Sequence, residues 1–89
     1  MAYFVVSYGL RKARDYQSLW DEFERLGAFK PLNSVYLIER DNTSAAELRD
    51  HLEGFIDDDD GLIVIEFDER PAAFKCKVGT AKWLKDHFG

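Results

Sequence analysis

The stretch Ser34 to Arg40, SVYLIER, decides the fold of this chain. Its central residues, VYLI, are β-branched, aromatic or aliphatic and favour a buried, pleated surface, so they predict a central β-strand. The run before it, AFKPLN (residues 28–33), contains Pro31, which has no N–H for a ladder and is tolerated at sheet edges. Residues 28–40 therefore predict a β-hairpin that turns at Asn33 and Ser34, with its weaker strand at the edge.

A lone hairpin is marginally stable in water, so this one needs further strands beside it. Two other stretches can supply them. Tyr3 to Tyr8 is apolar on both of its alternating faces, which predicts a central strand. Leu62 to Phe67, LIVIEF, is the last clear strand in the chain.

Two amphipathic helices connect the predicted strands. The first follows the loop GLRKAR (residues 9–14), with Asp15 as its expected N-cap and Gly27 as its C-terminal glycine. The second begins at Ser44, which forms a capping box with Glu47. Their apolar stripes are Tyr16, Leu19, Trp20, Phe23 and Leu26 in the first helix, and Ala45, Leu48, Leu52, Phe55 and Ile56 in the second. Residues 21, 22, 24 and 25 are expected mostly on the opposite, polar side of the first helix.

The order predicts an α+β protein: a ferredoxin-like βαββαβ sandwich in one domain, residues 1–89, with both helices on one sheet face. Residues 1–67 form the core and residues 68–89 a tail. In the tail, residues 73–78 alternate weakly and predict a short fifth strand, and residues 80–88 predict a short helix with Trp83, Leu84 and Phe88 turned inward. The other sheet face is too apolar to stay bare, so we expect a second protomer or the tail to cover it.

Charge is unevenly distributed along the chain, which has a net charge of −5. Residues 1–14 carry +3, residues 15–69 carry four basic and 16 acidic residues for a net −12, and residues 70–89 carry +4. The acidic centre repels nucleic-acid phosphates unless the two basic ends converge on one face. A single cysteine, Cys76, and an N-terminus without a signal-like basic start lead us to expect a cytoplasmic protein with no membrane partner.

Five basic residues are the candidate contacts to nucleic-acid phosphates: Arg11, Lys12, Arg14, Lys75 and Lys77. The first three lie in the GLRKAR loop, for which we favour the alternative of an exposed loop that offsets the acidic helix after it. The run from Asp57 to Asp60 offers oxygen ligands for a divalent metal, but a solvated turn after the second helix is the interpretation we favour. His51 and His87 have no metal-ligand partner at close spacing, so the sequence predicts no metal site and no catalytic residue.

Several motifs resemble those of a known group. The strand VVSYGL before a helix, the hairpin PLNSVYLIE and the segment IDDDDGLIVIEF resemble the CRISPR-adaptation endonuclease family of small ferredoxin-like dimers. The resemblance is closer to the SinR-like small bacterial proteins of the same superfamily. That likeness includes the Ser44-capped helix with the pair Arg49 and Asp50, and the late Trp-Leu-Lys at residues 83–85.

The resemblance implies a homodimer, often with the last strand or tail crossing to the partner. It also implies, for the endonuclease members, a metal-binding aspartate at the end of the first strand. Gly9 stands at that position here, so the magnesium site built from a pair of those aspartates is missing its carboxylates.

Three functions remain open at this point. The first is a non-catalytic dimeric module that binds nucleic acid and needs no cofactor. The second is a magnesium-dependent nuclease that uses other acids, such as Asp15 or the Asp57–Asp60 run. The third is an acidic protein-interaction or inhibitor module, which the net charge of −12 over residues 15–69 suggests.

Overall fold

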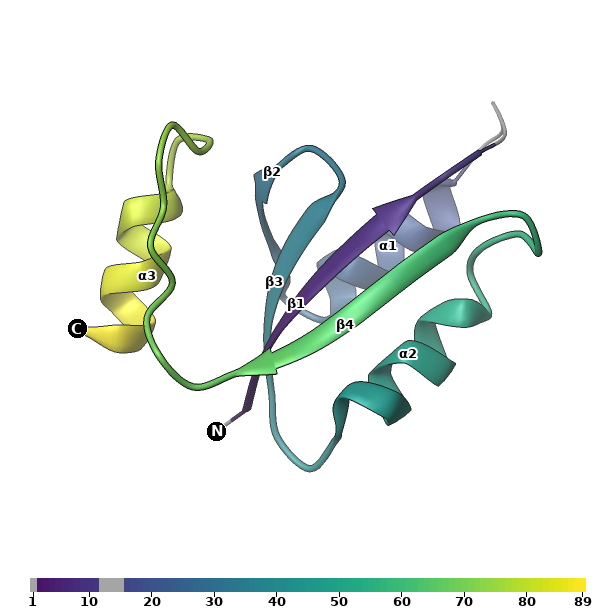
Figure 1. Cartoon of the computed structure of the whole chain (residues 1–89), viewed down its shortest axis with the longest axis horizontal. Helices are drawn as coiled ribbons and strands as arrows, with labels where there is room; N and C mark the ends of the chain where they lie inside the picture. The colour runs from purple at the N-terminus through teal and green to yellow at the C-terminus, as the bar shows by residue number, and fades with distance from the viewer. Residues whose placement is uncertain (1, 12–15) are drawn as a thin grey trace.

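The structure is a computed structural model that describes residues 2–11 and 16–89. Its strands are β1 (Ala2–Gly9), β2 (Phe29–Leu32), β3 (Val35–Arg40) and β4 (Gly61–Phe67), and its helices are α1 (Gln17–Arg25), α2 (Ala45–Glu53) and α3 (Thr80–Phe88) (Figure 1). The predicted order of a βαββαβ core followed by a helix is confirmed. Within the described ranges, no helix is long and apolar enough to pass through a bilayer.

The four strands form one sheet in the order β2-β3-β1-β4, and every neighbouring pair is antiparallel. The SVYLIER strand is therefore internal, as predicted, and β2 with Pro31 is an edge strand. The hairpin turns at Asn33 and Ser34, where Ser34 has a φ of 65° and its carbonyl accepts a hydrogen bond from the Tyr8 N–H at 3.1 Å. This small α+β arrangement is compatible with a ferredoxin-like fold.

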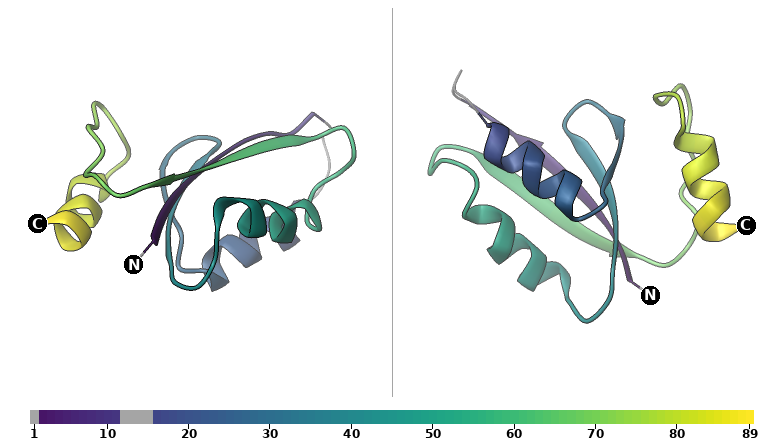
Figure 2. Two further views of the ribbon diagram at one scale, coloured as in Figure 1. Left: turned by 60° about the horizontal axis from the view of Figure 1, so that its bottom comes forward. Right: turned by 180° about the vertical axis from the view of Figure 1, so that it is seen from behind.

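Helices α1 and α2 lie side by side on the same face of the sheet (Figure 2). Strand β1 places Phe4, Val6 and Tyr8 beneath them, because alternate side chains of a strand share a face. Phe23 of α1 stacks on Tyr36 of β3 with ring centroids 3.9 Å apart. The rest of this core is Tyr16, Leu19, Leu26, Ile38, Leu48 and Leu52, which confirms the predicted apolar stripes within the two helices. The second stripe was predicted too long: α2 ends at Glu53, and Phe55 and Ile56 pack against the core from the turn after it.

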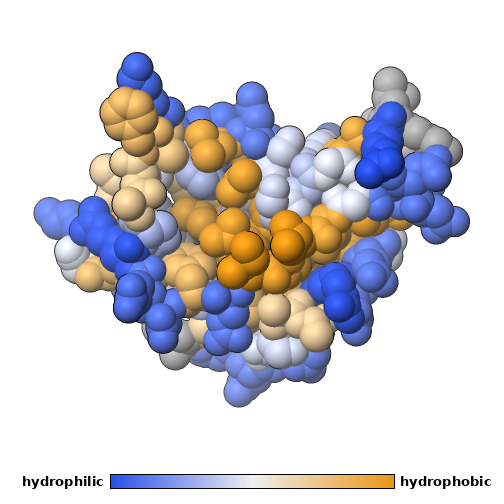
Figure 3. Space-filling model, in the orientation of Figure 1, coloured by the Kyte–Doolittle hydropathy of each residue, from blue (hydrophilic) through white to orange (hydrophobic). Residues whose placement is uncertain are grey.

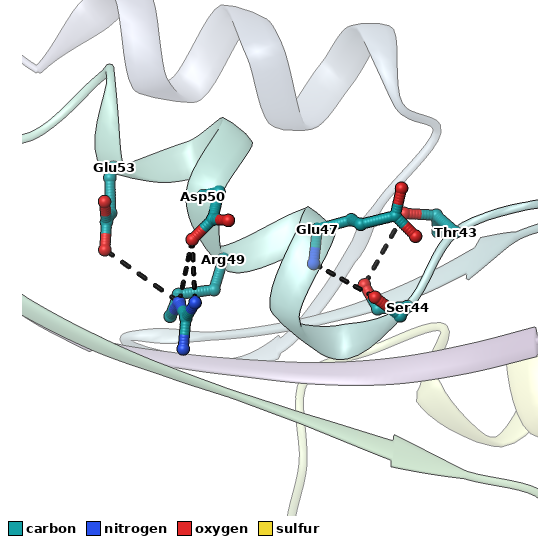
Figure 4. Close-up of polar contacts among 6 residues, drawn as sticks. All are labelled: Thr43, Ser44, Glu47, Arg49, Asp50 and Glu53. Carbon is teal, nitrogen blue, oxygen red and sulfur yellow. Dashed lines mark hydrogen bonds and ion pairs between the residues drawn. The ribbon is translucent and has the colours of Figure 1, made fainter.

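The predicted helix ends are largely confirmed. Gly27 has a φ of 69°, and the Ala28 N–H donates to the Phe23 carbonyl at 3.0 Å, which is a Schellman motif. The Ser44 Oγ accepts a hydrogen bond from the Glu47 N–H at 3.1 Å (Figure 4). Tyr16 occupies the N-cap of α1 without a side-chain cap, and Asp15 lies outside the described residues.

The predicted fifth strand at residues 73–78 is wrong. The segment approaches the β2 edge, where the Lys77 N–H donates to the Pro31 carbonyl at 2.8 Å. Pro31 has no N–H to return that bond, and Lys75 has a φ of 54°, which bends the chain away from an extended path. Residues 73–78 are therefore a connection to α3 rather than a strand.

Glu22 does not lie on the solvent side of α1, as its place in the helical pattern predicted, because only 7% of it is exposed. Its carboxylate accepts hydrogen bonds from Arg25 of the same helix at 2.6 and 2.7 Å and contacts His51 of α2. The Arg25 hydrogen bonds, reinforced by His51, hold the pKa of Glu22 at about 2, against an ordinary value of 4.5. Because α1 and α2 pack side by side, they bury the Glu22 carboxylate between them. Its ionic partners offset the free-energy cost of that burial.

The substitution Glu22→Gln tests this contact. We expect it to lower the free energy of unfolding at pH 7 by about 1–3 kcal/mol, because Arg25 and His51 lose their charged acceptor. A carboxyl with a depressed pKa stabilises the fold above its unfolded pKa and loses that contribution as the pH falls. The difference between wild type and variant should therefore shrink between pH 4.5 and pH 2.

Urea unfolding at a series of pH values measures this difference. Glu24→Gln is the matched control, because Glu24 is an exposed residue on the same helix and should change stability little at any pH. If the loss of unfolding free energy caused by Glu22→Gln does not change with pH, the contact stabilises the fold through its shape and not through the charge of Glu22.

Candidate functional site

The sheet face opposite α1 and α2 carries an apolar surface that these two helices leave uncovered. The pairing register puts Val5 of β1, Leu37 of β3 and Ile65 of β4 side by side on it. Figure 3 shows hydrophobic residues gathered over the middle of this face, with hydrophilic residues around them. We call this surface the open face; its residues are Tyr3, Val5, Ser7, Phe29, Val35, Leu37, Glu39, Ile63, Ile65 and Phe67.

Helix α3 packs against one end of the open face through aromatic rings. Tyr3 lies at the centre of this contact, with its ring centroid 4.5 Å from that of Phe88 and 6.2 Å from that of Trp83. Trp83 also stacks on Phe29 of the edge strand at 6.3 Å, and Phe88 on Phe67 at 5.8 Å. The predicted inward side of this helix is confirmed, and Leu84 is its most buried apolar residue.

Polar contacts fix the C-terminal end of α3 on the same sheet. The His87 Nδ1 lies 2.9 Å from the Glu39 carboxylate, and the Tyr3 hydroxyl donates to the His87 carbonyl at 3.3 Å. The hydrogen bond to His87 lowers the pKa of Glu39 below its usual range, and burial raises that of Tyr3. These two contacts through His87 join the tail to β1 and β3.

The tail covers only part of the open face. On β4, Ile63 is 57% exposed and Ile65 is 52% exposed, although both belong to the apolar surface. Leu32 at the end of β2 is also exposed. The expectation that the tail or a second protomer covers this face is met in part: the tail covers the Tyr3 end and Phe29 at the β2 edge, and it leaves Ile63 and Ile65 exposed.

The three candidate phosphate contacts among the described residues, Arg11, Lys75 and Lys77, do not gather in one place. The Arg11 N–H donates to Asp60 at 2.8 Å, next to the start of β4, whereas the Lys77 N–H bonds to Pro31 of β2. Strands β4 and β2 are the two edges of the sheet, so these anchor points are separated by three strand spacings, about 14 Å. Lys75 and Lys77 share one loop, and Lys12 and Arg14 lie outside the described residues.

A hollow of about 550 Å³ lies between α3 and the segment that leads into it. Three exposed basic residues line it, namely Arg70, Lys75 and Lys77. Its apolar wall includes Pro71, Val78 and Leu84, and Cys76 is also in the lining. The sequence pattern missed Arg70 as a member of this group, because residue 70 lines the same hollow as residue 77 only when α3 folds back along the segment before it.

The acidic run is a turn, as favoured from the sequence, and one of its residues has a structural role. Asp60 accepts hydrogen bonds from the Arg11 N–H at 2.8 Å, the Tyr16 hydroxyl at 2.7 Å and the Asp57 N–H at 2.9 Å. It therefore joins the end of β1, the start of α1 and the turn before β4. In residues 2–11 and 16–89, no cluster of three His, Cys, Asp or Glu side chains is arranged to hold a metal ion.

Gly9 is the last residue of β1 and pairs with Gly61. A Cβ atom at Gly9 would meet no neighbour within 4 Å, so packing does not require glycine there.

The pair Arg49 and Asp50 lies on the exposed side of α2, where Arg49 contacts Asp50 at 2.8 Å and Glu53 at 3.9 Å (Figure 4). A scan of protein-family models finds none that matches this chain.

The substitution Leu84→Ala tests how α3 is held. Leu84 is 3% exposed, so we expect the docking of α3 to weaken by about 2–5 kcal/mol through lost contacts and the cavity left behind. Hydrogen exchange should accelerate over residues 80–88 while β1 stays protected. Lys85→Ala, an exposed neighbour on the same helix, is the control. Equal loss of protection in β1 would mean that α3 and the sheet unfold as one unit.

Proposed function

We propose that this chain is a non-catalytic, dimeric module of the ferredoxin-like fold, related to the CRISPR-adaptation endonucleases, that binds nucleic acid through basic residues of its tail. The observation that carries the proposal is the half-exposed pair Ile63 and Ile65 on the open face, close to a tail of net charge +4. The apolar surface serves self-association, and the basic tail serves phosphate contact.

A second copy of this chain is the occupant that best suits the open face. The patch is a flat strand surface, and two such surfaces pack at about 10 Å in sheet-on-sheet layers. A two-fold axis would place Ile63 and Ile65 against the same residues of the other copy, which is how isologous dimers match one patch with itself. The resemblance to a family of homodimers points to the same assembly.

The absence of a carboxylate at Gly9 supports a module without nuclease activity by the family's route. Asp60 reaches the end of β1, but its two oxygens accept hydrogen bonds from Arg11, Tyr16 and Asp57. Those hydrogen bonds engage the lone pairs that a metal would need. We therefore expect no magnesium-dependent cleavage that relies on the end of β1.

Nucleic-acid contact is assigned first to Lys75 and Lys77. They line the same hollow, which Arg70 also lines, and they belong to the most basic segment of the described chain. The Arg11 backbone is bound to Asp60 in the acidic turn, a neighbour that weakens attraction for phosphates. Arg11, Lys12 and Arg14 would add a second set of phosphate contacts from the loop after β1.

The substitution Ile65→Asp tests self-association. We expect wild-type protein to sediment as a dimer and the variant as a monomer, because a buried unpaired carboxylate is costly in an apolar interface. Glu66→Lys is the control: residue 66 is exposed, sits next in β4 and points to the other face. A wild-type chain that sediments as a monomer at high concentration would contradict the dimer.

The double variant Lys75→Ala, Lys77→Ala tests phosphate contact. Loss of two cations should weaken binding of DNA or RNA at low salt and make the dependence of affinity on salt less steep by one to two contacts, about 0.7–0.9 in slope for each. Lys82→Ala, Lys85→Ala removes the same charge from exposed positions on α3 and should weaken binding less. Neutralising residues 11, 12 and 14 measures the second set. Wild-type protein that binds neither DNA nor RNA at low salt would remove this function.

A further inference from the structure

Phe74 is 81% exposed in the connection before α3, which is unusual for a phenylalanine. It follows Ala73 in the run Phe-Lys-Cys-Lys and does not line the hollow formed by its neighbours. Its ring therefore points away from the tail's own apolar packing. Neither the core beneath α1 and α2 nor the aromatic contact of α3 includes it.

The backbone around Phe74 keeps the ring outside. Lys75 has a φ of 54°, a left-handed conformation that turns the chain sharply after Phe74. Two residues after Lys75, the Lys77 N–H donates a hydrogen bond to the Pro31 carbonyl, which fixes the loop against the β2 edge. An exposed ring on an anchored loop loses little conformational freedom when a ligand packs on it.

One lysine lies over the ring, and further basic side chains line the neighbouring hollow. The Lys75 ammonium lies 5.3 Å from the centroid of the Phe74 ring, within the range of a cation–π contact. Arg70, Lys75 and Lys77 line the hollow beside it, which at about 550 Å³ falls within the usual size of a ligand site. An aromatic face next to several basic side chains is the combination with which proteins hold single-stranded nucleic acid.

We propose that Phe74 is a stacking platform for one unpaired base of a single-stranded nucleic acid, with the sugar–phosphate backbone over the hollow and its phosphates on Lys75, Lys77 and Arg70. This inference rests on the nucleic-acid binding proposed above and names its substrate as single-stranded. Bases of a duplex are already stacked on one another and cannot reach an isolated ring. Three cations on a chain of net charge −5 give few phosphate contacts, so stacking supplies a large part of the affinity.

Fluorescence anisotropy with a labelled oligothymidine and its duplex with oligoadenine tests the proposal. We expect the single strand to bind more tightly than the duplex, with a salt slope of about −2 for three phosphate contacts. Phe74→Ala should weaken single-strand binding by about 5- to 100-fold and leave the salt slope unchanged, because stacking releases no counterions. Phe74→Trp should restore the affinity.

Leu32→Ala is the matched control, since Leu32 is an exposed apolar residue at the end of β2 that does not line the hollow, and its substitution should leave binding unchanged. Equal affinity for single strand and duplex, together with no effect of Phe74→Ala, would overturn the stacking role and leave the proposed function standing. No binding of any oligonucleotide at low salt would remove both. A shift of Phe74→Ala from dimer to monomer in sedimentation would instead place the ring in the protein interface and overturn the proposal.

Discussion

Strand β1 is apolar on both of its faces, and the rest of the structure follows from the need to keep water from each of them. Phe4, Val6 and Tyr8 are covered by two helices that the βαββαβ order delivers to one side. Tyr3 and Val5 point the other way, so a two-layer sandwich alone cannot bury the strand. The tail covers part of the second face by packing aromatic rings on Tyr3. The part of that face that stays exposed is the surface of the proposed dimer.

The sequence predicted those parts of the fold in which a local pattern and a burial requirement agree. SVYLIER, the Gly27 helix end and the Ser44 cap each follow from short-range chemistry, and each is present in the structure. The fifth strand failed because alternation in residues 73–78 says nothing about whether a strand edge is free to pair. The edge that the segment meets is β2, where Pro31 cannot donate a hydrogen bond.

The site was harder to predict, because its members meet only through the path of the tail. Lys75 and Lys77 were visible as a basic run, but Arg70 joins them only when α3 folds back along the segment before it. Glu22 shows the same limit: its helical position indicates solvent, yet the neighbouring helix brings His51 onto it. The pattern of residues along one helix or strand predicts which of its faces is apolar. It does not predict charged contacts made by side chains of another helix or strand.

The direction of α3 explains why the open face is only partly covered. The helix places Phe88 on Phe67 of β4 and Trp83 on Phe29 of β2, so it runs across the strands rather than along β4. Ile63 lies four residues back along β4 from Phe67, outside that path. Turning α3 along the strand would move Trp83 off Phe29 and separate His87 from Glu39. The contacts that hold the tail in place therefore also leave Ile63 and Ile65 exposed. The apolar patch is a consequence of this packing, and the proposed second copy of the chain would remove it from water.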